Sequence, residues 1–170
     1  MSSSSRPSGV HPVLTLINKC DSLAQTFDST FEHSCTLLTN LANATPAPGQ
    51  PTTMDDTLLS LRSTLEKCEQ VVGAMLNCIY EDIPHLLDQL DNGVEAGVGN
   101  HDAKQALDGI SQLFYSYQDL LLEKRELLAD FTCEEISPQH FITHWTSIDN
   151  NLASQRKQQV DDLADLLAAF

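Results

Sequence analysis

Residues 16–41 read LINKCDSLAQTFDSTFEHSCTLLTNL, and the spacing of their apolar side chains decides the fold class. Apolar or small residues recur there every three or four positions, which places them along one stripe of an α-helix. The members of this first stripe are Leu16, Cys20, Leu23, Phe27, Thr30, Ser34, Leu37 and Leu41. A second stripe beside it consists of Ile17, Ala24, Phe31 and Leu38. Together they form an apolar face broader than a two-stranded coiled-coil seam, which predicts more than one neighbouring helix.

Three further stretches show the same spacing, at Leu58–Leu90, Leu107–Phe131 and Phe141–Phe170. Helix-breaking segments separate the first three stretches, because residues 45–51 hold three prolines and residues 91–100 hold three glycines. Ser137 followed by Pro138 is a typical start for the last helix. We therefore predict a single helical domain over residues 11–170, preceded by a flexible tail at residues 1–10. Its helices are expected over about 12–44, 54–90, 102–131 and 138–169.

The predicted fold class is all-α, and the sequence is compatible with two arrangements of these helices. Helices of about 30 residues are about 45 Å long, and short connections favour antiparallel neighbours. The first arrangement is therefore an elongated four-helix bundle. The second keeps two helical hairpins apart, each paired with helices of a partner chain. Both arrangements use coiled-coil-like packing of long helices.

Pro84 interrupts the second stretch of helical spacing. A proline inside a helix removes a backbone hydrogen bond and clashes with the preceding turn, so we predict a kink or a break near residues 80–83. Asp82 falls on the apolar stripe of this helix. A change of helical phase at the kink is expected to bring Ile83 onto the stripe in its place.

The chain is strongly acidic, with a net charge of −15 from nine basic and 24 acidic residues. The basic residues are scattered, which argues against direct binding to nucleic acid or to anionic lipid. No apolar stretch reaches the roughly 18 residues that span a bilayer, and the serine-rich start lacks the apolar segment of a secretory signal. The odd number of cysteines, five, fits free thiols in an intracellular protein, either cytoplasmic or nuclear.

Two histidines, His140 and His144, lie four residues apart and share one helix face, a spacing that can chelate a metal ion. However, the sequence lacks the glutamate of an H-E-x-x-H site and contains no E-x-x-H motif of the kind found in carboxylate-bridged metal bundles. A surface histidine pair is therefore the favoured interpretation, and a metal-binding four-helix bundle is the least favoured function. We predict no enzyme activity, no metal, no cofactor and no small-molecule substrate.

Aromatic residues concentrate where the third and fourth predicted helices meet. The cluster consists of Phe114, Tyr115, Tyr117, Phe131, Phe141 and Trp145. A hydrophobic junction between the two helices is the favoured interpretation, and an exposed anchor for a partner is the alternative. Trp145 shares a stripe with Phe141 and is predicted to be buried. Tyr115 lies off the main stripe and is predicted to be exposed.

The leading functional hypothesis is a non-enzymatic scaffold subunit that packs against other helical subunits of a hetero-oligomer. In architecture alone, the chain resembles small acidic helical subunits of kinetochore, spindle or microtubule, vesicle-tethering and Mediator-like complexes, and no motif selects one of them. The alternative is a compact helical adaptor module that binds one partner helix. The residues predicted to contact a partner are Leu23, Phe27, Phe31, Leu38 and Tyr115. The first four belong to the wide face of the first helix, which exceeds what three other helices are expected to cover.

Overall fold

The computed structural model describes residues 12–43, 53–92 and 99–147, together with residues 154, 157–159, 161–162 and 165. These residues form helices and turns without any β-strand, so the described part of the chain is all-α. Its elements are α1 (Pro12–Asn43), α2 (Thr53–Asn77), the π-helical turn η1 (Cys78–Asp82), α3 (Ile83–Asn92), α4 (Gly99–Thr132) and α5 (Pro138–Ser147). The tail predicted at residues 1–10 lies outside the described residues, as does most of the last predicted helix beyond residue 147.

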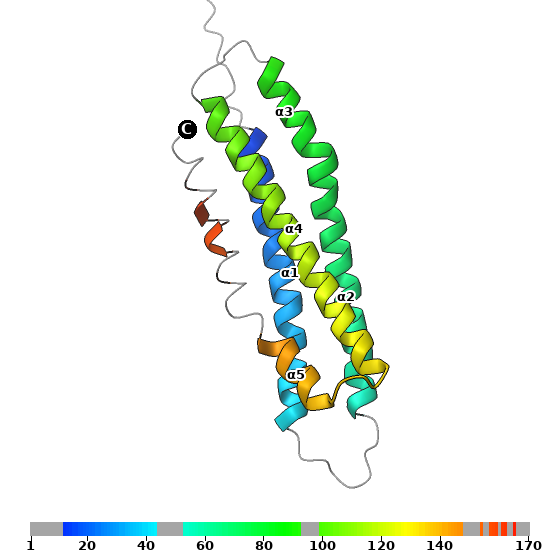
Figure 1. Cartoon of the computed structure of the whole chain (residues 1–170). Helices are drawn as coiled ribbons and strands as arrows, with labels where there is room; N and C mark the ends of the chain where they lie inside the picture. Colours follow the sequence, from blue (N-terminus) through cyan, green and yellow to red (C-terminus); the bar gives the residue numbers. More distant parts are fainter. Residues whose placement is uncertain are drawn as a thin grey trace, which may run out of the picture.

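Helices α1, α2 and α4 run side by side along the long axis of the molecule (Figure 1). The short helix α5 lies at the end of the molecule where α1 ends, and it packs against both α1 and α4. Helix α2 packs against α1 and α4. Side chains from these helices form one apolar core, whose largest fully buried aromatic members are Trp145, Tyr117, Phe27, Phe114 and Phe141. None of the described helices is both long enough and apolar enough to cross a lipid bilayer.

The buried face of α1 is one stripe, whereas the sequence spacing predicts two. Its members are Val13, Leu16, Ile17, Cys20, Ala24, Phe27, Phe31, Ser34 and Leu38. This set takes all of the second predicted stripe but only half of the first. Leu23, Thr30 and Leu37 from the outer side of the first stripe are only partly buried. The face is therefore narrower than predicted, and helices of the same chain are enough to cover it.

The chain stays helical on both sides of Pro84 because of the π-helical turn η1, in which the Ile83 N–H donates to the carbonyl of Cys78. A π turn holds one more residue than an α turn, so the buried position moves from Asp82 to Ile83. The predicted change of phase at Ile83 is confirmed, and no break occurs there. Asp82 accepts a hydrogen bond from Lys19 of α1 at 3.0 Å, which lowers the pKa of Asp82 and raises that of Lys19.

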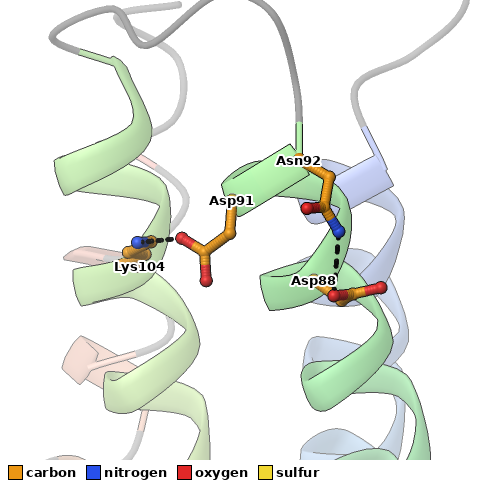
Figure 2. Close-up of polar contacts among 4 residues, drawn as sticks. All are labelled: Asp88, Asp91, Asn92 and Lys104. Atoms are coloured by element: carbon orange, nitrogen blue, oxygen red, sulfur yellow. Dashed lines mark hydrogen bonds and ion pairs between the residues drawn. The ribbon is translucent and has the colours of Figure 1, made fainter.

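An ion pair joins α3 to α4 near the point where α3 ends. Figure 2 shows the ammonium group of Lys104, on α4, against the carboxylate of Asp91, on α3. Beside it, Asn92 Nδ2 donates to Asp88 Oδ1 at 3.0 Å. Because Lys104 and Asp91 are both about half exposed, water screens their attraction, and the pair contributes less than about 1 kcal/mol.

Backbone hydrogen bonds order the corner between α4 and α5. The Glu135 N–H donates to the carbonyl of Asp130 at 2.9 Å, and Glu134 adopts a φ of 60°, the left-handed conformation that ends many helices. Ser137 then caps α5, since its Oγ accepts a hydrogen bond from the His140 N–H at 3.2 Å. This corner turns the chain back, so that α5 lies against α1 and α4.

Candidate interaction surface

Two of the residues predicted to contact a partner, Phe27 and Phe31, lie in the centre of the core. Phe27 packs edge-on against Tyr117 of α4, with ring centroids 4.9 Å apart. Phe31 stacks on Trp145 of α5, with ring centroids 5.6 Å apart. Both rings therefore pack where α1, α4 and α5 of this chain meet, and side chains of these helices surround them.

The other three predicted residues differ in their exposure. Leu38 is fully buried, Leu23 is partly buried against the core, and Tyr115 is 40% exposed. The exposure predicted for Tyr115 is confirmed. Contact with a partner remains a prediction for all five residues, but packing within the chain now accounts for the burial of Phe27, Phe31 and Leu38. Among the five, Tyr115 is therefore the most exposed candidate for contact with a partner.

Trp145 is completely buried, which confirms the prediction from the stripe that it shares with Phe141. Its Nε1–H donates to Ser34 Oγ at 2.9 Å, and its ring centroid lies 5.4 Å from that of Phe141. Ser34 is buried as well, and its hydroxyl donates to the carbonyl of Phe31. The indole thus joins α5 to α1 by apolar contact and by a satisfied hydrogen bond.

Lys124 of α4 is the one charged residue that the described structure buries fully, with 1% of its surface exposed. Its Nζ donates to the carbonyl oxygens of Trp145 at 2.9 Å and His144 at 3.3 Å. The same ammonium lies over the rings of Phe31 and Trp145, at 5.2 and 5.6 Å from their centroids. Carbonyl dipoles and aromatic faces both stabilise a buried cation, so Lys124 links α4 to α5 and α1.

Three large exposed side chains lie on η1 and α4: Tyr80 is 66% exposed, Tyr115 40% and Leu122 53%. We call these three residues the tyrosine patch. A hydrogen bond with Tyr80 of η1 raises the pKa of Tyr115, so the hydroxyl groups of these two tyrosines lie close together. Leu122 follows Tyr115 by two helical turns, so both lie on the same face of α4. The patch therefore presents three large, partly apolar side chains at the outside of the molecule.

Sequence spacing did not single out Lys124, Tyr80 or Leu122. Lys124 fills the position of the α4 stripe between Leu121 and Leu128, and this spacing is a signal from which its burial could be predicted. The exposure of Leu122 could also be predicted, because it lies seven residues after Tyr115 and therefore on the same helix face. The sequence gives no such signal for Tyr80, because this residue lies in the π turn.

A groove of about 530 Å³ lies between α1 and the described C-terminal residues. Its polar lining includes Asp21, Asp28, Glu32, Tyr117, Lys157 and Asp161. The Tyr117 hydroxyl donates to Asp28 Oδ2 at 3.0 Å, which ties α4 to α1 at the groove. Carboxylates dominate this lining, as expected for the surface of a strongly acidic chain.

His140 and His144 lie together on the exposed side of α5, with ring centroids 4.1 Å apart. Among the residues that the structure describes, no three histidine, cysteine or acidic side chains come together in a way that could hold a metal ion. A structural zinc site needs four protein ligands and a catalytic one needs three. That the chain carries no metal remains a prediction.

The five cysteines are all free thiols. Burial raises the pKa of Cys20 and Cys68 to about 12. Burial, together with a hydrogen bond to Asp82, also raises the pKa of Cys78. Because the thiolate is the reactive form, these three thiols are inert in the folded protein.

We expect native protein at pH 8 to react with Ellman's reagent at Cys133 first, since this thiol is exposed, and then more slowly at half-buried Cys35. Cys20, Cys68 and Cys78 should react only on unfolding, which brings the total to five. The absorbance of the released thiolate measures each phase, and Cys133→Ser should remove the fast one. Rapid native labelling of Cys20 or Cys68 would contradict their burial.

No protein-family model, no curated protein and no solved structure matches this chain.

Proposed function

We propose that this chain is a non-enzymatic adaptor, an elongated four-helix bundle with coiled-coil-like packing that binds a helical segment of another protein. It works in a hetero-oligomer and takes no small-molecule substrate, cofactor or nucleic acid. One observation carries the proposal: the aromatic core around Phe31 is enclosed by the chain's own helices, while the tyrosine patch faces outward. A bundle with an enclosed core is folded before it meets its partner and presents a rigid surface.

The contacts of α1 support the four-helix arrangement. Helix α1 packs against α2 and α5, which also pack against α4. Beyond α5, residues Ser154, Lys157 and Asp161 line one groove with residues between Asp21 and Glu32 of α1. This order, with later residues beside earlier positions of α1, is the one expected of a fourth helix that runs antiparallel to α1.

A scaffold subunit of a larger helical assembly is the second candidate, and the length of the helices favours it. Helices α1 and α4 hold 32 and 34 residues, or about 50 Å each at 1.5 Å per residue. Long helices of this kind suit kinetochore, spindle, tethering or Mediator-like assemblies. In both candidates the protein acts inside the cell, in the cytoplasm or the nucleus, and its five free thiols support that location.

Amine crosslinking in the native cells, followed by purification of the tagged chain and mass spectrometry, tests the proposal. We expect crosslinks from the exposed Lys67 and Lys104 to helical segments of other proteins. Lys124 should give none, because its ammonium is buried, and it serves as the internal control. If the chain gives no crosslinks to other proteins above those of an untagged sample, the binding function is wrong.

Sedimentation and thermal unfolding of the purified chain separate the two candidates. An adaptor should be a monomer that unfolds in one cooperative transition. A scaffold subunit that depends on its partners should aggregate or remain partly unfolded when alone.

A further inference from the structure

We infer that the tyrosine patch docks a basic amphipathic helix of the partner protein. The inference rests on the proposed function, because it names the surface of the adaptor and the chemistry of the partner helix. Tyr80, Tyr115 and Leu122 would supply the apolar contact, and acidic side chains around them would pair with lysines or arginines beside the apolar stripe of that helix.

The two helices under the patch are antiparallel, and two contacts define their register. Tyr80 meets Tyr115, and Glu69 of α2 binds Arg125 of α4 at 2.7 Å. Gly73 lies between Glu69 and Tyr80 in the sequence, so the antiparallel register places it about level with Leu122 of α4. A Cβ added at Gly73 would meet nothing within 4 Å.

The glycine therefore serves no close contact within this chain, although glycine inside a helix is destabilising by about 1 kcal/mol relative to alanine. It lowers the surface of α2 beside Leu122 and lets a second backbone approach there. A helix laid along the patch would use this space.

The charge beside the patch is mainly negative. On α4, Asp119 lies between Tyr115 and Leu122 on the same face, and Glu126 follows Leu122 by one turn; both carboxylates are exposed. Exposed carboxylates of this kind attract lysine and arginine and steer their approach.

On α2, exposed Glu66 precedes Gly73 by two turns, and Arg62 lies one turn farther from the patch. The nearest cation on α4, Arg125, is already paired with Glu69. The patch therefore complements a partner helix whose flanks are basic.

The same charges argue against a second copy of this chain as the occupant. In a symmetric dimer, a surface meets its own copy. Asp119 and Glu126 would then face the acidic surface of the other copy, in a protein whose net charge is already −15. Like charges brought together across an interface disfavour that contact.

Fluorine NMR on protein labelled with 3-fluorotyrosine tests the inference, because the chain has three tyrosines. Tyr80 and Tyr115 belong to the patch, and Tyr117 is buried and serves as the internal reference. The probe is a synthetic lysine–leucine amphipathic helical peptide, and the control peptide has glutamate in place of each lysine. Resonances are assigned with single Tyr→Phe variants. We expect the lysine peptide to shift the signals of Tyr80 and Tyr115 but not that of Tyr117, and the glutamate peptide to shift none.

Two matched variants separate apolar docking from attraction by charge. Leu122→Glu changes the patch on α4. Leu59→Glu makes the same change at an exposed leucine of α2, which lies about 21 Å along that helix from Gly73. Both variants add a negative charge, so charge alone would tighten binding of the lysine peptide. We expect Leu122→Glu instead to weaken binding at least about tenfold, and Leu59→Glu to leave it within about twofold. Circular dichroism confirms that both variants are folded.

Several results would overturn the inference. These are no binding of the lysine peptide, binding without shifts of Tyr80 and Tyr115, equal weakening by Leu59→Glu, and a shift of Tyr117 that reports entry into the core. A wild-type dimer that Leu122→Glu dissociates would make a second copy the occupant and would also overturn it. If the patch fails but crosslinked partners persist in the cell with Leu122→Glu, the adaptor function stands and uses another surface.

Discussion

Phe31→Asp is expected to abolish the cooperative fold of the isolated chain. The ring is buried, stacked on Trp145 and 5.2 Å from the Lys124 ammonium. Loss of a buried phenylalanine costs about 3–5 kcal/mol, and an introduced carboxylate adds the cost of desolvating a charge. Because small domains are stable by about 5–15 kcal/mol, the sum removes most or all of that margin. Circular dichroism and urea unfolding of the purified variant measure the effect.

Two companion variants make the result specific. Phe31→Leu keeps an apolar side chain and should remain folded with a smaller loss. Phe31→Asn has the shape of the aspartate variant without its charge. If Lys124 rescues the carboxylate by an ion pair, Phe31→Asp will be more stable than Phe31→Asn. If the Phe31→Asp protein is as helical and as stable as wild type, Phe31 belongs to an interface with a partner, and the scaffold hypothesis is supported.

The positions of the helices could be predicted because their signals are local. Spacing of three and four along α1, the Ser137–Pro138 start of α5 and the proline at position 84 all act within one or two turns. Burial of Trp145 and exposure of Tyr115 follow from phase on a single helix in the same way. Each of these features can be predicted without knowing which helices pack against one another.

Which residues of α1 are buried within the chain could not be predicted in that way. Two adjoining stripes predict a face too wide for one small domain, and partner contact at Phe27 and Phe31 is predicted from that width alone. In the structure, the buried line takes parts of both stripes, and α4 and α5 supply the rings that cover it. Which helix covers which face depends on long-range packing that spacing in one segment does not contain.

Lys124 and Tyr80 show two further limits of local spacing. Lys124 occupies an apolar position of α4, and its burial depends on carbonyl oxygens and rings from α5 and α1. Tyr80 is exposed beside Tyr115 and lies within the π turn, where regular α-helical spacing does not apply. The patch proposed to bind a partner therefore forms only after α2 and α4 pack against each other.

Trp145→Ala is expected to destabilise the protein by about 3–5 kcal/mol, the usual cost of emptying a large, fully enclosed aromatic site. The loss should be concentrated in the docking of α5. The described part of this helix spans 10 residues, and it is held against α1 and α4 through Trp145, Phe141 and the Lys124 ammonium. Urea unfolding followed by circular dichroism gives the change in unfolding free energy.

Trp145→Phe separates the ring from its hydrogen bond. Phenylalanine fills most of the site but cannot donate to Ser34 Oγ, whose hydroxyl still donates to the carbonyl of Phe31. Ser34 therefore keeps one partner, and the variant should lose about 1–2 kcal/mol, well below the alanine variant. Since Trp145 is the single tryptophan, wild-type emission should be blue-shifted and resistant to iodide quenching. Red, readily quenched emission would show that the indole lies in solvent. That result, or an alanine variant as stable as wild type, would contradict the packing of α5 on α1.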